Sequence, residues 1–159
     1  MKPIFSVLAL LVASALPVHA ATPTPVPEKI ASHDGPVRIA VIRNLGSDDN
    51  TTQFVQGAIQ QGKALGFKVS TFLTNGDDAK FQDFVNQAIS QKYDGIILSQ
   101  GRAPYAAPLI KKIVDSGIAV SVFDTSVDGT IPGATVTQQD DASLTKLSFG
   151  QLVQDHNGK

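Results

Sequence analysis

Polar side chains follow three apolar stretches of this sequence, each at the point where a predicted strand ends. The stretches are residues 37–42, 95–98 and 118–123, and the pairs that follow them are Arg43-Asn44, Ser99-Gln100 and Asp124-Thr125. In open parallel sheets, ligands bind in the crevice outside the carboxyl ends of the strands. We therefore expect these polar groups to lie along one edge of a sheet and to line a binding cleft.

The residue types at this edge do not make a catalytic set. Ser99 has no candidate general base, because neither His33 nor His156 lies near a strand end. The loop after the first strand lacks both G-x-G-x-x-G and G-x-x-x-x-G-K-[ST], so nucleotide binding has no support. The chain contains no cysteine, which excludes disulfides, a thiolate nucleophile and cysteine-ligated zinc. We expect a binding protein with no catalytic residue, metal site or cofactor.

Alternating strands and helices would position these groups. Strands are predicted at 37–42, 67–73, 95–98, 118–123 and 134–137. Three sets of apolar residues at helical spacing lie between the first four strands: Phe54, Val55, Ala58, Ile59 and Leu65; Phe81, Phe84, Val85, Ala88 and Ile89; and Ala106, Leu109, Ile110, Ile113 and Val114. Because strand–helix–strand units are right-handed and the loops are short, the predicted fold is α/β, a doubly wound parallel sheet with helices on both faces.

The first twenty residues are typical of a secretory signal peptide. Lys2 gives a positive start, residues 4–16 are mostly apolar, and Val18-His19-Ala20 has the small-x-small form of a cleavage site. This apolar run is shorter than the span of about 20 residues that crosses a bilayer. We expect export, cleavage near Ala20 and no stable membrane insertion afterwards.

Residues 21–36 form the predicted linker, since four of them are proline and several others are Thr, Ser or Gly. Without Lys2, the chain has 12 basic and 14 acidic residues, a net charge near −2. A nucleic-acid surface would need a basic stripe, so nucleic acid is not an expected partner.

Five segments resemble the amino-terminal lobe of the periplasmic sugar-binding proteins of ABC importers, of the ribose- and galactose-binding type. They are residues 37–42 (VRIAVI), 62–67 (GKALGF), 93–99 (YDGIILS), 116–124 (SGIAVSVFD) and 136–141 (VTQQDD). The resemblance implies a periplasmic receptor that captures a sugar or related polyol between two lobes and delivers it to an ABC permease. The main alternatives are a secreted α/β enzyme and a sensory sugar-binding receptor outside transport.

The resemblance also implies a domain organisation. Residues 37–137 correspond to the amino-terminal lobe, and residues 138–159 to a hinge crossover with the first helix of a second lobe. The hinge positions would be Thr137, Gln138, Gln139 and Asp140. Because an alternating βα chain would continue with another strand after that helix, we expect this chain to be a truncated or partial binding protein.

Sugar hydroxyls both donate and accept hydrogen bonds, so a sugar site needs carboxylates, amides and hydroxyls, with aromatic rings over the apolar face of the sugar. The positions that the resemblance assigns to the ligand are Asn44, Asp48, Asn50, Ser99, Arg102, Asp124 and Thr125. Two departures put ribose itself in doubt. Asn50 and Thr51 stand where related ribose binders carry aromatic residues, and Thr125 stands where an arginine is common. Stacking would then come from Tyr105 or from a second lobe.

Two of these assignments have a structural alternative. Asp48, Asp49 and Asn50 precede a predicted helix, where acidic and Asn residues cap unpaired N–H groups whether or not a ligand binds. Arg43 could form an ion pair with Asp124 across neighbouring strand ends. The sequence supports this structural role as well as it supports a role in ligand binding.

Overall fold

The computed structural model describes residues 33–46, 48–125, 127 and 129–157. The predicted signal peptide at 1–20 and most of the predicted linker at 21–36 lie outside these residues. Within the described part, no helix is long and apolar enough to cross a membrane.

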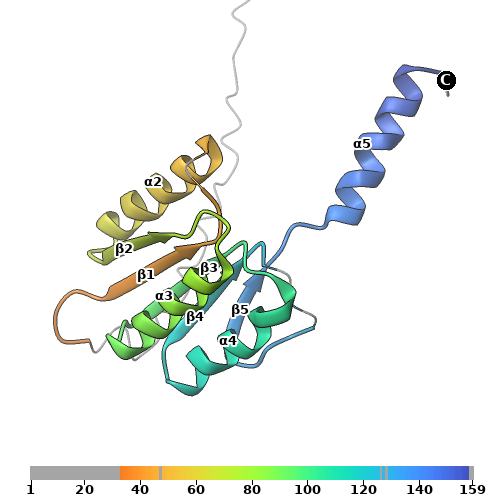
Figure 1. Cartoon of the computed structure of the whole chain (residues 1–159). Helices are drawn as coiled ribbons and strands as arrows, with labels where there is room; N and C mark the ends of the chain where they lie inside the picture. The colour runs from red at the N-terminus through yellow and green to blue at the C-terminus, as the bar shows by residue number, and fades with distance from the viewer. Residues whose placement is uncertain (1–32, 47, 126, 128, 158–159) are drawn as a thin grey trace, which may run out of the picture.

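Five parallel strands form one sheet in the order β2-β1-β3-β4-β5 (Figure 1). The strands are β1 (Arg38–Arg43), β2 (Lys68–Leu73), β3 (Gly95–Ser99), β4 (Ala119–Phe123) and β5 (Ala134–Thr137). The helices are α2 (Asp49–Ala64), α3 (Asp78–Ser90), α4 (Ala103–Asp115) and α5 (Asp141–Asp155). The predicted α/β class is confirmed, and the connection between β4 and β5 is the one crossover made without a described helix.

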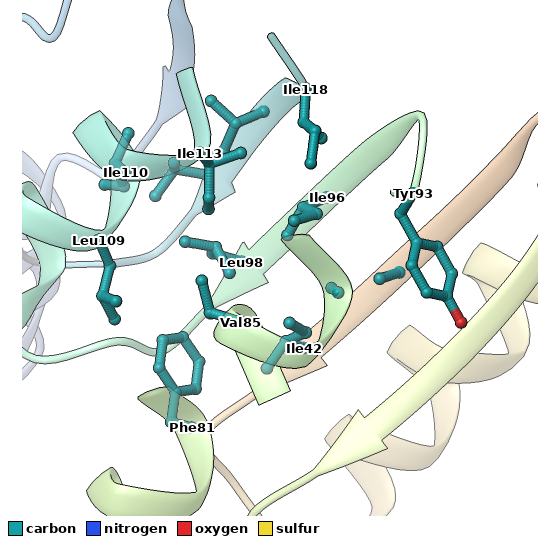
Figure 2. Packing of buried hydrophobic residues seen from close by; sticks show 14 of the residues in the cluster. Ile42, Phe81, Val85, Tyr93, Ile96, Leu98, Leu109, Ile110, Ile113 and Ile118 are labelled. Atoms are coloured by element: carbon teal, nitrogen blue, oxygen red, sulfur yellow. The ribbon is translucent and has the colours of Figure 1, made fainter. Parts of the chain in front are cut away.

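The hydrophobic core lies between one face of the sheet and helices α3 and α4. Side chains alternate along a strand, so Ala40 and Ile42 of β1 point to this face together with Ile96 and Leu98 of β3. Figure 2 shows the side chains that meet them from the two helices: Phe81, Val85, Leu109, Ile110 and Ile113. All of these are residues that the helical spacing predicted to face the sheet.

Helix α2 covers the opposite face, chiefly over β2. A close approach allows this packing, since a Cβ atom on Gly62 would come within 2.2 Å of a methyl group of Val69. The prediction for α2 was only partly right, because Ile59 and Leu65 are exposed although both belong to its apolar set. Leu65 borders an apolar groove on this face that no described helix fills, which explains its exposure.

Capping residues fix where the first two helices begin. The side chain of Asp48 accepts a hydrogen bond from the backbone N–H of Thr51, and the side chain of Asp77 accepts from those of Ala79 and Lys80. Gly66 follows α2 at a positive φ of 75°, a backbone conformation that glycine adopts without steric cost. The Asp48 cap therefore begins α2 a few residues after the carboxyl end of β1.

Candidate functional site

The carboxyl ends of β1, β3 and β4 lie side by side, as the sequence predicted. Arg43 pairs in register with Ser99, and Ser99 with Phe123. Hydrogen bonds continue the alignment past the strands, because Asn44 N donates to Ser99 O at 3.0 Å and Gln100 N donates to Asp124 O at 3.1 Å. The predicted polar pairs therefore meet at one edge of the sheet.

Asp124 and Gln100 share an unusual backbone conformation at this edge. Their φ angles are 48° and 62°, in the left-handed region that non-glycine residues seldom occupy. The side-chain amide of Gln100 donates to the carboxylate of Asp124, and the neighbouring Gly101 N donates to Thr125 Oγ1 at 3.1 Å. Such conformations persist where surrounding contacts enforce them, and they concentrate at ligand sites. The paired strand ends hold the Asp124 carboxylate, which is partly exposed, in a fixed place.

Arg43 occupies the buried centre of the edge, with 1% of its surface exposed. Its guanidinium donates to Thr51 Oγ1 at 3.0 Å, Ser99 Oγ at 2.7 Å and Asn50 Oδ1 at 2.5 Å, and it lies 4.6 Å from the ring centroid of Phe54. Burial lowers the pKa of Arg43, and the attraction of the Asp48 and Asp124 carboxylates acts in the opposite direction.

The ion pair with Asp124, one of the two roles considered for Arg43, is not observed between these two described residues, and Arg43 bonds to neutral side chains. The reason is the alternation of the strand. Residue 43 points to the face covered by α2, where Asn50 and Thr51 of the first helical turn reach it. Arg43 thus ties β1 and β3 to the start of α2.

Asp48 and Asn50 both act in this local structure. Asp48 caps α2, and its hydrogen bond from Thr51 N holds the pKa of its carboxyl below the usual value. Asn50 accepts from Arg43 through its side-chain oxygen. Both residues are nevertheless exposed, so these hydrogen bonds leave each side chain with surface that a ligand could contact.

Asn44 belongs to a second polar cluster, on the other face of the sheet. Its amide donates to Asp78 Oδ1 at 2.8 Å and to the Tyr105 hydroxyl at 3.1 Å, and its carbonyl oxygen accepts from Thr74. Tyr105 donates to Asp78 at 2.8 Å, and Arg102 Nη1 lies 3.2 Å from the same carboxylate. The Tyr105 hydroxyl bond is the largest contribution that lowers the pKa of Asp78, while burial raises the pKa of Tyr105. This cluster joins the end of β1 to α3 and α4.

The seven predicted ligand residues therefore differ in accessibility. Asp48, Asn50 and Arg102 are exposed and Asp124 is partly exposed, whereas Asn44, Ser99 and Thr125 are buried. The exposed residues lie at the surface of the polar edge. The buried residues hydrogen-bond to its backbone and to the guanidinium of Arg43. The exposed members of this set carry carboxylates, an amide and a guanidinium, which are types of group that can hydrogen-bond to hydroxyls.

Sequence reasoning missed an aromatic pair. Phe54 of α2 stacks on Phe123 of β4 with ring centroids 5.7 Å apart, and Phe123 is 41% exposed. Tyr105, which the sequence offered with a second lobe as a source of stacking, packs on Phe81 and donates its hydroxyl to Asp78. The signal for the pair was present, since residue 123 ends a strand and residue 54 lies one turn into the helix that begins beside that strand end.

Comparison with known proteins agrees with this geometry. The periplasmic binding protein domain family matches residues 39–159. The chain belongs to this family. Its members are solute-binding proteins and not enzymes, so the alternative of a secreted α/β enzyme is set aside. Family members that serve ABC importers are periplasmic, bind sugars and interact with permeases. No curated protein matches the chain.

Several solved structures share the fold. A sugar ABC transporter protein from Yersinia enterocolitica is 73% identical with a TM-score of 0.78, over 87% of this chain and 42% of that one. A 5-methylthioribose transporter solute-binding protein from Thermotoga lettingae, in complex with 5-methylthioribose, is 32% identical with a TM-score of 0.71, over 77% of this chain and 38% of that one. An ABC sugar transporter subunit from Rhodobacter sphaeroides is 25% identical with a TM-score of 0.67, over 77% and 43%. The chain thus spans less than half the length of these relatives.

Proposed function

We propose that this chain provides one lobe of a periplasmic solute-binding protein, and that it captures a small polyhydroxylated solute, a sugar or polyol, for an ABC permease. The observation that supports this most directly is the Asp124 carboxylate, which Gln100 holds at the polar edge. A carboxylate accepts two hydroxyl hydrogen bonds at once, which gives it orientation selectivity for vicinal diols. The solute bound to the Thermotoga lettingae relative is a sugar derivative of this kind.

The remaining expectations become part of this proposal. Residues 1–20 serve as the export signal with cleavage near Ala20, residues 21–36 as a linker, and residues 37–137 as the ligand-binding lobe. Thr137, Gln138, Gln139 and Asp140 form a hinge crossing, followed by a helix of a second lobe. Ligand would lie between two lobes that close about such crossings, and the permease would recognise the closed form.

Half a site binds weakly, and this property gives the first test. Ligand sites normally bury about 70 to 90% of a ligand, whereas one lobe leaves much of it in water. We expect this chain to bind sugars with dissociation constants near millimolar at best. Calorimetry with a panel of pentoses, hexoses, polyols and 5-methylthioribose measures this directly. Micromolar affinity would contradict the assignment of a single lobe.

NMR titration locates the site on the chain. A bound solute should shift the amide signals of Gln100, Gly101 and Asp124 in the isotope-labelled protein, because these amides lie close to the Asp124 carboxylate. Asp124→Asn should abolish these shifts, since Asn tolerates the left-handed backbone but carries no charge. Asp115→Asn is the matched control, because Asp115 is an exposed carboxylate at the end of α4. Equal binding by both variants, or shifts confined to another surface, would refute the proposed site.

A further inference from the structure

Gln100 is absent from the ligand residues that the sequence predicted, although its side chain is bound to one of them. Its amide Nε2 donates to Oδ2 of Asp124. Because a carboxylate only accepts hydrogen bonds, the amide must turn its NH2 group toward Asp124 and its carbonyl oxygen away. Both residues are half-buried, so this contact lies within reach of solvent at the polar edge.

Paired positive φ angles end β3 and β4 at the same register. Ser99 pairs with Phe123, and the residues that follow them, Gln100 and Asp124, have φ angles of 62° and 48°. Gln100 N donates to Asp124 O at 3.1 Å, and Asp124 N donates to Thr137 O at 3.0 Å. A residue with a Cβ atom disfavours this left-handed conformation, so it persists only where surrounding contacts enforce it. The two residues are thus joined twice, once through the backbone and once through their side chains.

Tight packing next to Gln100 keeps this backbone in place. A Cβ atom on Gly101 would lie 2.9 Å from a methyl carbon of Thr125 and 3.3 Å from a ring carbon of Phe81. Phe81 and Thr125 are both buried, and Gly101 N donates to Thr125 Oγ1 at 3.1 Å. The Gln100 side chain therefore starts from a fixed backbone, which a group that orients another one requires.

The Gln100 amide is also the group that restrains the Asp124 carboxylate. Arg43 attracts this carboxylate, but its guanidinium donates to three neutral side chains of α2 and β3. Among the residues that the structure describes, no other side chain donates a hydrogen bond to Asp124. Without the amide, the carboxylate would be able to rotate among several side-chain conformations.

We propose that Gln100 is a positioning residue that orients the Asp124 carboxylate and thereby sets which arrangement of hydroxyls the polar edge accepts. The part of this inference that concerns the solute rests on the proposed function. A carboxylate has about four acceptor positions, and the amide takes one of them, so the others remain for hydroxyl donors in fixed directions. A rotating carboxylate would follow a hydroxyl that changes side, so it would discriminate less between epimers.

The orientation is tested first without any solute, on the complete chain. Three-bond NMR couplings between the backbone and the carboxyl carbon of Asp124 report whether its side chain keeps one rotamer. We expect the couplings of a single rotamer in the wild type and averaged couplings in Gln100→Ala. Gln87→Ala is the matched control, because Gln87 is exposed on α3 and should leave the couplings unchanged. Averaged couplings in the wild type, or unchanged couplings in Gln100→Ala, would overturn the proposal.

Gln100→Glu separates positioning from a merely structural role. At neutral pH the introduced carboxylate repels that of Asp124 and cannot donate to it, so the couplings should average as in Gln100→Ala. Two neighbouring carboxylates share a proton on acidification, and at about pH 5 this proton restores a donor between them. The couplings of the variant should then return at least halfway to those of the wild type, which should not change between the two pH values. Couplings of Gln100→Glu that are the same at both pH values would contradict orientation by a hydrogen bond.

The consequence for the solute is measured by calorimetry. For the sugar of the panel that binds the wild type most tightly and its epimer at one hydroxyl, Gln100→Ala should lower the ratio of the two dissociation constants by about threefold or more, the effect of one net hydrogen bond. Gln87→Ala should leave this ratio unchanged. An unchanged ratio in Gln100→Ala would overturn the role in selectivity. Absence of binding by the wild type would contradict the proposed function and the selectivity with it, whereas the couplings would still decide whether Gln100 orients Asp124.

Discussion

Arg43 is the largest of the fully buried side chains in the described structure, and it carries a charge. Its three hydrogen bonds to side chains connect β1, β3 and α2 at the ligand edge. A charge is tolerated at such a position only when hydrogen bonds replace its water. The shape of the proposed binding edge therefore depends on this one guanidinium.

Replacement of Arg43 by Met should lower the free energy of unfolding by about 2 to 4 kcal/mol, since each buried polar group left without its partner costs about 1 to 3 kcal/mol. Urea denaturation measures the loss. Arg102→Met is the control, because the exposed pair of Arg102 with Asp78 should contribute less than about 1 kcal/mol. Similar losses from the two variants would show that burial of Arg43 does not matter for stability.

Asp48 should make stability depend on pH in the acidic range. Its hydrogen bond from Thr51 lowers the pKa of the folded carboxyl, so the unfolded chain binds the proton more tightly. The contribution of Asp48 is then fully present above the unfolded pKa, about 3.9, and is lost as the pH falls through the lower folded value. The pKa values of Asp78 and Asp140 are lowered as well, so they act in the same direction.

We therefore expect the free energy of unfolding to decrease as the pH falls below about 5. Asp48→Asn should make this decrease shallower while it preserves the helix cap, because Asn caps about as well as Asp. Urea melts between pH 3 and 6 give both slopes. Parallel curves for the two proteins would mean that the carboxyl of Asp48 titrates equally in the folded and unfolded chains.

The meeting of the polar strand ends at one edge of the sheet could be predicted from the sequence, but the hydrogen-bond partners of these residues could not. Strand ends identify an edge of a parallel sheet, so Asn44, Ser99 and Asp124 were expected together. Whether a strand-end side chain faces α2 or α3 depends on the exact register of the strand, and a shift of one residue exchanges the faces. Arg43 and Asn44 are adjacent in sequence and join different helices for this reason.

At the level of elements, the contact between α2 and β2 is unusually close. A Cβ atom on Gly62 would lie 2.2 Å from a methyl carbon of Val69 and could not be accommodated without movement. Gly57 lies in the same helix with nothing within 4 Å of its would-be Cβ atom. The two glycines allow helix propensity and packing to be separated within one helix.

Gly62→Ala should destabilise the protein by about 1 to 3 kcal/mol, because overpacking outweighs the better helix propensity of Ala. Gly57→Ala should instead stabilise it by up to about 1 kcal/mol. Thermal or urea unfolding compares the two, and Gly62→Ala/Val69→Ala should recover part of the loss. Stabilisation by both single substitutions would contradict the close approach of α2 to the sheet.

The elements themselves could be predicted well from the sequence, since every predicted strand begins and ends within a residue of the observed one. Buried strands and one-sided helices leave a strong periodic signal. The exposure of Leu65 could not be predicted, because an apolar helix face shows that a residue can be covered but not what covers it. The same uncertainty holds for α5, whose apolar residues are interleaved with Thr145, Ser148 and Gln151.

Over the whole molecule, α5 differs from the sheet in what holds it in place. Hydrogen exchange in dilute solution should show this difference. Amides of residues 144–153 should exchange almost freely, whereas those of residues 96–98, in the middle of the sheet, should be strongly protected. Strong protection in the most dilute sample would mean that α5 has a partner within its own chain.

The strand order also determines how the molecule can be built during synthesis. Once β1, α2 and β2 have formed a pair of strands with one helix, each later strand joins the same growing edge: β3 beside β1, then β4, then β5. No strand has to insert between two that are already paired. The amino-terminal part can therefore fold while later residues are still emerging, since domains generally begin folding from the end that is made first. A chain stopped after β3 or β4 would keep its earlier strand pairs and expose only its newest edge.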